Sequence, residues 1–322
     1  MKVRILYHDH CFDGAASAAY FNRFVQARFY PAAEFAFTGM AHKAAQLFEP
    51  ELFDGDVNAI VDFKYSPDER LTWWFDHHQS AFLTPEDQAH YESTRDGRKL
   101  YLDITSRSCT KYIAKIAKEE YGFEAPDLAD LVHWADIVDG AVYERAEVPV
   151  EMKEPALKLV LVIEAAKGSE TVQRIIRLMQ HRTLSEIIED AAIQELYKPL
   201  HERHLRSIDL IGKLGHCEGG VIHFDVADYD MEGYNKFVPY YLFPQGTYTV
   251  SVSLSSFRTK ISVGSNPWAA EEPRHNLATI CERYGGGGHP RVGAISFERD
   301  EVARAREVAK VIVEELRGEP SA

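Results

Sequence analysis

Three short apolar runs near the start of the chain have the composition of buried strands. Residues 3–7, 57–61 and 71–75 are dominated by aliphatic, β-branched and aromatic side chains, and each run is too short to be a typical helix. Small alanines follow Gly14 and begin a helical segment, and helical periodicity returns at residues 106–120. Because strand, polar loop and helix in that order open a βαβ unit, we expect an α/β domain with a parallel sheet.

Each apolar run ends in side chains that are suited to binding a cation. His8 follows the first run, Asp62 follows the second, and Asp76, His77 and His78 follow the third. The carboxyl ends of the strands in an open parallel sheet are where ligands bind. Histidine is the commonest metal ligand, and aspartate favours hard cations. The pattern therefore predicts a metal site at this edge of the sheet.

Two further aspartates are candidate ligands. Asp13 precedes the alanine-rich helix and can cap it, but capping leaves His8 unexplained. Asp136 lies among apolar neighbours in a helical segment at residues 127–138. A buried carboxylate is costly unless it is paired or bound to a metal. We therefore add both aspartates to the candidate site.

The pattern changes in the second half of the chain. Residues 149–215 are mostly helical with few turn signals, which predicts a helical connector between a catalytic domain at residues 1–148 and a smaller α/β domain at residues 216–322. In the last domain, four glycines at 285–288 precede His289. The N–H groups of such a loop can form an anion-binding nest, and the alternative is a mobile hinge. The strands predicted there are residues 221–226, 248–254, 260–263 and 294–297, and the helices are residues 276–284 and 302–316.

Composition narrows the classes of partner. The chain has 322 residues, 45% of them hydrophobic, and a formal net charge of −14, which argues against a broad basic surface for long duplex DNA. A short anionic substrate remains compatible, since a metal ion or a few arginines supply local positive charge. The four scattered cysteines are typical of reduced thiols, and neither a signal peptide nor a membrane-spanning run is evident, so we expect a soluble cytoplasmic protein.

Taken together, these motifs resemble the DHH phosphoesterase superfamily, in the branch with an associated DHHA carboxyl-terminal domain. The resemblance covers nearly the whole chain, and its central motif is Asp76-His77-His78. Similar proteins include RecJ-like exonucleases, nano-RNases and exopolyphosphatases. The resemblance implies a parallel-sheet DHH domain, a smaller DHHA-type domain, an active site in the cleft between the two lobes, and two manganese ions or related ions such as Mg²⁺ or Co²⁺.

The resemblance also implies a role for each candidate residue. One cation would be held by His8, Asp13 and Asp62, and Asp62 would bridge to a second cation held by His77 and Asp136. The catalytic residues would be Asp76, which orients His77, and His78, which contacts the scissile phosphate. The residues expected to grip the substrate are Arg258, Gly286, Gly287, Gly288 and His289.

The first motif departs from the family pattern. Relatives carry two aspartates close together, whereas here Asp13 is accompanied by Cys11 and Ala15 at the possible partner positions. One cation site is therefore expected to be weak, with water, Asp9 or His10 filling the gap. Alternatively, Cys11 coordinates as a thiolate and favours softer metals, or it only packs.

The sequence therefore predicts a divalent-metal-dependent phosphoesterase, of the ester-hydrolase class, that uses a metal-activated water. Its expected partner is a short single-stranded oligonucleotide or a small nucleotide phosphate, with no membrane and no long duplex DNA. Two alternatives stay open: an exopolyphosphatase, and a non-catalytic nucleotide-binding protein with a degenerate metal site. An oligomer is compatible with the sequence.

Overall fold

The computed structural model describes residues 1–41, 48–231 and 233–318. The chain forms two compact units. Unit 1 comprises Met1–Tyr143 and Lys153–Leu200, and unit 2 comprises Glu144–Met152 and His201–Ala322. The expected connector, residues 149–215, is divided between the two units. Residues 153–200 belong to unit 1 with the N-terminal sheet, and the rest of the connector belongs to unit 2.

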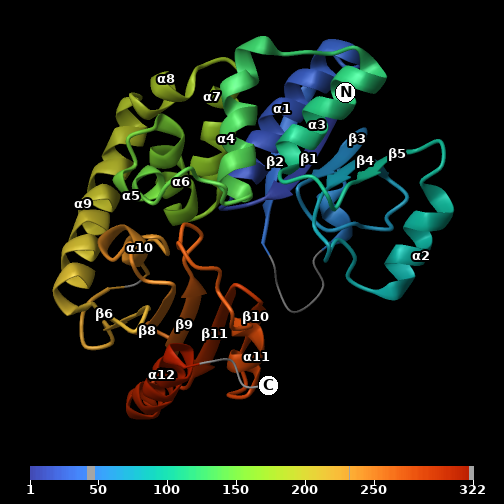
Figure 1. Cartoon of the computed structure of the whole chain (residues 1–322). Helices are drawn as coiled ribbons and strands as arrows, with labels where there is room; N and C mark the ends of the chain where they lie inside the picture. The colour runs from blue at the N-terminus through green and yellow to red at the C-terminus, as the bar shows by residue number, and fades with distance from the viewer. Residues whose placement is uncertain (42–47, 232, 319–322) are drawn as a thin grey trace. The chain divides into compact units, whose positions relative to one another are not determined.

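Unit 1 is built on a parallel sheet with the strand order β2-β1-β3-β4-β5 (Figure 1). The three predicted strands are confirmed as β1, β3 and β4, whereas β2 and β5, at the two sheet edges, were not predicted. The strands are β1 (Lys2–His8), β2 (Glu34–Met40), β3 (Val57–Val61), β4 (Leu71–Asp76) and β5 (Lys99–Leu102).

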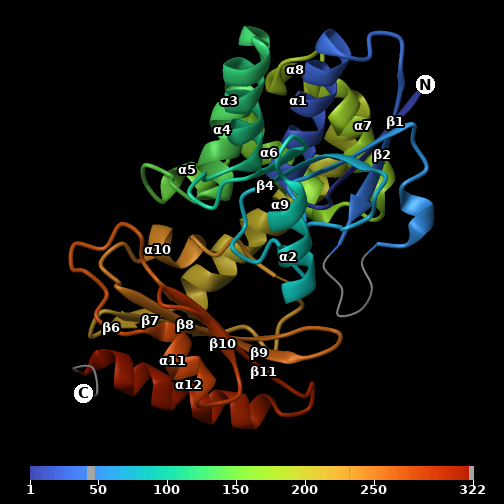
Figure 2. The same ribbon diagram turned by 90° about the vertical axis from the view of Figure 1, so that its right-hand side faces the viewer.

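Helices of unit 1 pack mainly on one face of this sheet. Side chains alternate along β4, so Trp73 and Phe75 join the large helix-covered core, while Trp74 joins a smaller core on the opposite face. Figure 2 shows the helices of unit 1 beside the sheet. The helices are α1 (Phe12–Arg28), α2 (Pro85–Thr94), α3 (Cys109–Tyr121), α4 (Ala129–Asp139), α6 (Pro155–Ala165), α7 (Ser169–Met179), α8 (Leu184–Ile188), the 3₁₀ turns η1 (Pro50–Leu52) and η2 (Pro126–Leu128), and α9 (Ala191–Leu214), which continues into unit 2.

The strand order creates a topological switch point. From β1 the chain moves through α1 to β2 on one side, and β3 then pairs with β1 on the other side. Open α/β sheets bind ligands outside the carboxyl ends of the strands at such a point. The expected site edge is therefore also the edge that the topology favours for a ligand.

Close packing of α1 against β1 depends on one glycine. A Cβ atom added at Gly14 would lie 2.1 Å from the backbone oxygen of His8. The alanines that follow, Ala15 and Ala16, are completely buried. Gly14 therefore lets the helix start close to the end of the strand that carries His8.

Unit 2 is built on a mixed sheet with the order β10-β11-β9-β8-β7-β6, in which only the β7–β8 pair is parallel. The predicted strands and helices of this domain are confirmed, with β6, β10 and α10 in addition. The elements are α5 (Glu147–Glu151), β6 (His216–Glu218), β7 (Val221–Asp225), α10 (Val238–Leu242), β8 (Tyr248–Leu254), β9 (Thr259–Ser265), α11 (Leu277–Glu282), β10 (Gly287–His289), β11 (Val292–Phe297) and α12 (Val302–Arg317).

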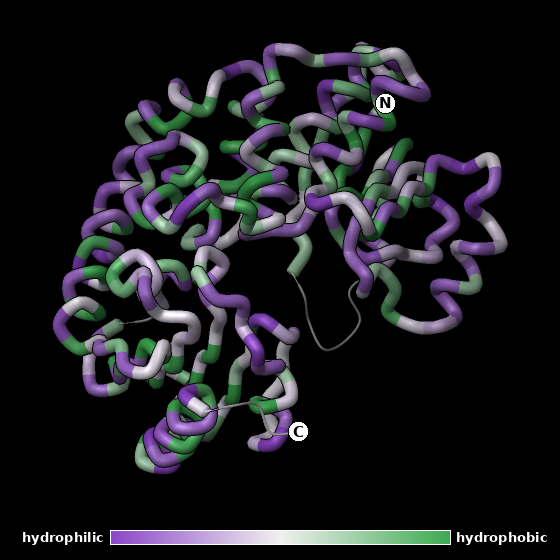
Figure 3. Tube along the Cα trace, in the orientation of Figure 1, coloured by the Kyte–Doolittle hydropathy of each residue, from purple (hydrophilic) through white to green (hydrophobic). Residues whose placement is uncertain are grey.

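The core of unit 2 lies between this sheet and the helices α11 and α12. Hydrophobic and hydrophilic residues are interspersed along α12 (Figure 3). The hydrophobic ones recur at the spacing expected for a helix with one buried face. Among the described residues, no helix of either unit combines the length and the apolar character that crossing a membrane requires.

The second half of the glycine run forms an edge strand instead of an open loop. Gly287–His289 is β10, which pairs antiparallel with β11. A Cβ atom at Gly286 or Gly288 would lie 2.2 Å from the backbone oxygen of Ala294 or Val292, respectively. Close strand pairing is therefore a structural reason for glycine at these two positions. A Cβ atom at Gly287 would meet no atom within 4 Å, so the structure gives no such reason there.

Replacing Gly14 by alanine is expected to destabilise the protein. The added methyl group overlaps the backbone of β1, so Gly14→Ala should lower the free energy of unfolding by about 1–3 kcal/mol. The control is Gly212→Ala in α9, where the new Cβ atom makes only ordinary contacts of 3.8 Å with Leu242. We expect the control to be neutral or slightly stabilising. Urea denaturation followed by circular dichroism measures both, and equal stability of the two variants would contradict the packing argument.

Candidate metal centre

The register of the sheet brings the predicted strand-end residues together. Tyr7 pairs with Val61, and Val61 pairs with Phe75. The residues that follow these three positions are His8, Asp62 and Asp76, so they emerge side by side from neighbouring strands. The structure therefore brings these three residues to one edge of the sheet, and their role as ligands stays a prediction.

Asp62 is the centre of the cluster. Its Oδ2 atom lies 3.4 Å from His8 Nδ1, and its Oδ1 atom lies 3.4 Å from His77 Nε2 and 3.9 Å from His78 Nδ1. Asp62 is only 1% exposed, yet neither carboxylate oxygen has a hydrogen-bond partner among the described residues. Its backbone lies in the left-handed region, with φ of 56°, and its N–H group donates a hydrogen bond to the carbonyl of Phe75. A strained, buried carboxylate of this kind points to function rather than to stability.

Asp13 contributes to the cluster and also anchors a helix. Its carboxylate accepts hydrogen bonds from the amides of Cys109 and Thr110 and from the Thr110 hydroxyl, all at the start of α3. Its Oδ2 atom lies 3.9 Å from His77 Nε2. Asp13 therefore caps a helix, as the alternative interpretation held, but the helix is α3 and not its own helix α1.

The third carboxylate of the cluster is Asp139, whereas the expected Asp136 does not join it. Asp139 Oδ2 lies 3.3 Å from His77 Nε2, and Asp13, His77 and Asp139 form one of the groups whose ligand atoms all lie within 4.8 Å. Asp136 instead pairs with Lys111 Nζ at 2.7 Å and lies 3.8 Å from Arg107. The structure thus explains Asp136 by the pairing that a buried carboxylate needs. The local sequence does not distinguish Asp136 from Asp139 as a ligand, since both lie in α4.

The two histidines of the central motif are oriented by different groups. Asp76 Oδ1 lies 2.7 Å from His78 Nδ1 and accepts a hydrogen bond from the backbone amide of His77. The ring of His77 is positioned by the carbonyl of Ser106, 3.0 Å from its Nδ1 atom. The expectation that Asp76 orients the His77 ring is therefore wrong, because its carboxylate holds the next histidine. Ser106 was not identified from the sequence.

Several carboxyl groups are crowded around His77 in a buried space, and their pKa values reflect this. Burial, together with the charges of Asp62 and Asp139, raises the pKa of Asp13 well above its usual range. Burial and the charge of Asp62 also raise the pKa of Asp139 to about 6. For His77, burial alone would lower the pKa, but Asp62, Asp13 and Asp139 raise it to about 10. Asp62 differs from these two acids: burial alone would raise its pKa, but the neighbouring imidazoles of His77 and His8 lower it to about 2.

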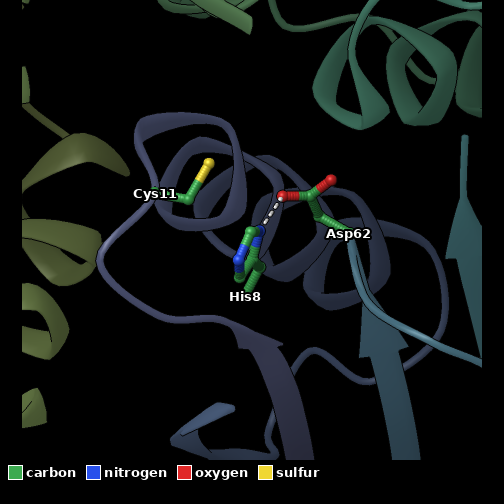
Figure 4. Close-up of side chains that lie close together, drawn as sticks. All are labelled: His8, Cys11 and Asp62. Carbon is green, nitrogen blue, oxygen red and sulfur yellow. Dashed lines mark ion pairs between the residues drawn. The ribbon is translucent and has the colours of Figure 1, made fainter. Parts of the chain in front are cut away.

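The donor set fits divalent cations. Imidazole nitrogens and carboxylate oxygens bind manganese, cobalt, iron and zinc ions. Three overlapping groups of candidate ligands have their donor atoms within 4.8 Å of one another, namely His8, Cys11 and Asp62; Asp62, His77 and His78; and Asp13, His77 and Asp139. Figure 4 shows the first group, with the Cys11 side chain and the Asp62 carboxylate on either side of His8. The sharing of Asp62 and His77 between groups is compatible with two neighbouring cations.

The residues predicted to grip the substrate lie in unit 2. Arg258 is in the turn between β8 and β9, where its guanidinium donates to the Ser296 hydroxyl at 2.9 Å and lies over the Phe257 ring. His289 is exposed at the end of β10. Their role toward a substrate stays a prediction.

Comparison with known proteins identifies the fold. No family model and no curated protein match the sequence. A solved pGpG-specific phosphodiesterase, PggH from Vibrio cholerae, matches with a TM-score of 0.71 and 15% identity, and the match covers 99% of this chain and 100% of that chain.

Two further solved structures share the fold. A DHH-domain protein, described as a member of a family of ribosomal proteins, matches with a TM-score of 0.56 and 13% identity, over 99% of this chain and 87% of that chain. RecJ from Thermus thermophilus in complex with Mn²⁺ matches with a TM-score of 0.54 and 14% identity, over 97% of this chain and 52% of that chain. The chain thus shares the fold of these solved proteins, and the expected α/β architecture with a parallel N-terminal sheet is confirmed.

The two aspartates of α4 make a matched pair for testing the cluster. Asp139→Asn removes a charge that faces His77, so we expect Mn²⁺ affinity to fall by at least about tenfold. Asp136→Asn changes a carboxylate that is paired with Lys111, so it should leave Mn²⁺ affinity close to that of the unmodified protein. Calorimetric titration of both variants measures this. The assignment of Asp139 is wrong if Asp136→Asn weakens binding and Asp139→Asn does not.

Proposed function

We propose that this protein is a divalent-metal-dependent phosphoesterase that hydrolyses short oligonucleotides or nucleotide phosphates. The observation that carries the proposal is the buried, hydrogen-bond-deficient Asp62 at the switch point, surrounded by His8, His77, Asp13 and Asp139. Bound cations would supply an activated water and neutralise charge on a phosphate. Asp62 and His8 would hold one cation, and Asp62, His77, Asp13 and Asp139 would hold the other.

The protein's own contribution is to fix these donors before a substrate binds. Asp13 is held by three hydrogen bonds from the start of α3, and His77 is held by the Ser106 carbonyl. Because Asp13 and His77 are anchored to different segments of unit 1, these two donors would need little reorganisation on binding. Preorganised charge of this kind is the main means by which enzymes stabilise a transition state.

His78 is the proposed contact to the scissile phosphate. Its Nδ1 atom is engaged by Asp76, which leaves Nε2 to face a ligand, and 36% of its side chain is exposed. The hydrogen bond to Asp76 raises the pKa of His78 above its usual value, even though burial opposes the shift. A protonated His78 can donate a hydrogen bond to a phosphate oxygen and stabilise its negative charge.

The substrate class is proposed from the fold and from the charge of the chain. PggH, whose solved structure matches over 99% of this chain and 100% of its own, is named as a pGpG-specific phosphodiesterase. The net charge of −14 disfavours a long nucleic acid. Both observations favour a substrate of a few nucleotides, with Arg258 and the segment 286–289 proposed as its additional contacts.

Hydrolysis should depend on His77. We expect the unmodified protein with added Mn²⁺ to release mononucleotides from linear dinucleotides, including pGpG. His77→Ala should lower kcat by at least about a hundredfold, because a preorganised donor is lost from the reacting centre. The control His133→Ala changes an exposed histidine of α4 and should keep full activity. A panel that also contains phosphoadenosine phosphate, cyclic dinucleotides and polyphosphate tests the class. Hydrolysis of polyphosphate alone would favour the exopolyphosphatase alternative.

His289 should contribute to substrate binding and not to metal binding. We expect His289→Ala to raise KM while leaving the calorimetric affinity for Mn²⁺ unchanged. The matched control is His216→Ala, since His216 is an exposed histidine on β6, at the other edge of the same sheet. A loss of Mn²⁺ affinity in His289→Ala would contradict this division of roles, and so would an equal rise in KM in the control.

A further inference from the structure

Cys11 stands at the start of α1, next to the cluster. It precedes α1 as the N-cap residue, with an extended backbone, and its side chain makes no capping hydrogen bond. Serine, threonine, aspartate and asparagine are the residues that stabilise a helix start, so helix stability does not explain a cysteine here. The thiol is not in a disulfide.

Cys11 and Ala15 stand at the two positions where a second aspartate was expected, and the structure shows which of them faces the cluster. Ala15 is completely buried in the large core between α1 and the sheet. The Cys11 sulfur, by contrast, lies in a group with His8 and Asp62 whose donor atoms are all within 4.8 Å of one another. Figure 4 shows the sulfur and the Asp62 carboxylate on either side of the His8 ring. Of the two candidates, Cys11 is the one that faces the cluster.

A second observation points to a ligand at the same place. Asp62 is only 1% exposed, and neither of its carboxylate oxygens has a hydrogen-bond partner in the part of the chain that the structure describes. One of these oxygens, Oδ2, is directed at His8. A desolvated carboxylate beside an imidazole and a thiol is the arrangement that a cation would stabilise.

We propose that Cys11 is a thiolate ligand of one cation position, which makes the metal centre asymmetric. The His8–Cys11–Asp62 position then has a mixed nitrogen, sulfur and oxygen donor set, whereas the Asp13–His77–Asp139 position has only nitrogen and oxygen donors. Thiolate ligands favour Zn²⁺, Fe²⁺ and Co²⁺, and Mg²⁺ strongly prefers oxygen ligands. This inference rests on the proposed metal dependence and deepens it by assigning different cations to the two positions.

Charge balance supports a thiolate in this role. A cysteine bound to a divalent cation loses its proton and carries one negative charge. It therefore supplies the charge that a carboxylate would supply at the same position, while changing the softness of the donor. The first position keeps its attraction for a dication, and its selectivity moves away from Mg²⁺.

The test uses cobalt as a spectroscopic probe of the full-length protein. After removal of metals with a chelator, Co²⁺ should produce a thiolate-to-cobalt charge-transfer band in the near ultraviolet. Cys11→Ser should lose that band, and its ratio of Zn²⁺ to Mn²⁺ affinity should fall by at least about tenfold. Cys11→Asp should also lose the band but should still bind Mn²⁺. The control Cys217→Ser, on β6 of unit 2, should keep the band.

A second measurement needs no variant. Zn²⁺ should slow the alkylation of Cys11 by iodoacetamide, read by peptide mass spectrometry, and should leave the alkylation of Cys217 unchanged. Binding of cations without the band and without protection of Cys11 would overturn this inference and leave the proposed function intact. If calorimetry detects no cation binding to the unmodified protein, the proposed function fails as well.

Discussion

The buried charge of Asp62 is the constraint on which the candidate site depends. A carboxylate that is 1% exposed and has no hydrogen-bond partner among the residues that the structure describes loses several kcal/mol of solvation, which nearby opposite charge has to offset. The imidazoles of His8 and His77 lie 3.4 Å from its oxygens. Two further acids, Asp13 and Asp139, lie against the His77 imidazole, and their raised pKa values reflect the crowding of carboxyl groups there. A fold selected for stability alone would not gather these groups, so a divalent cation is the natural complement.

The position of Asp139 shows the same priority of function over stability. It is the last residue of α4, where the negative end of the helix dipole disfavours a carboxylate. Asp13 differs, because its hydrogen bonds to the start of α3 give it a structural role as well. Thr110, which donates to Asp13, also bonds to Ser17 of α1. The cluster is therefore tied to the packing of α1 against α3, and the ligand geometry depends on that helix pair.

The sequence was sufficient to predict the strand ends but not the contacts between distant segments. Three apolar runs, each ending in histidine or aspartate, predict a common edge because parallel strands all point the same way. The choice between Asp136 and Asp139 depends on Lys111 of α3, which is a tertiary contact that no local pattern contains. The edge strand β2 is only partly buried and β5 is short, so neither gives a sustained apolar run. The close approach of the glycines at 285–288 to β11 likewise becomes visible only when the two segments pair.

Under the proposed function, charge would link metal binding to substrate binding. In the absence of cations, the carboxylate of Asp62, whose pKa is lowered, presents negative charge to any phosphate that approaches, and the net charge of −14 adds to the repulsion. Bound cations would reverse the sign of the local field and favour phosphate binding, and by linkage a bound phosphate would favour the cations equally. The acidic composition is therefore consistent with an anionic substrate, because the attraction that basic residues provide elsewhere would here come from the metal centre.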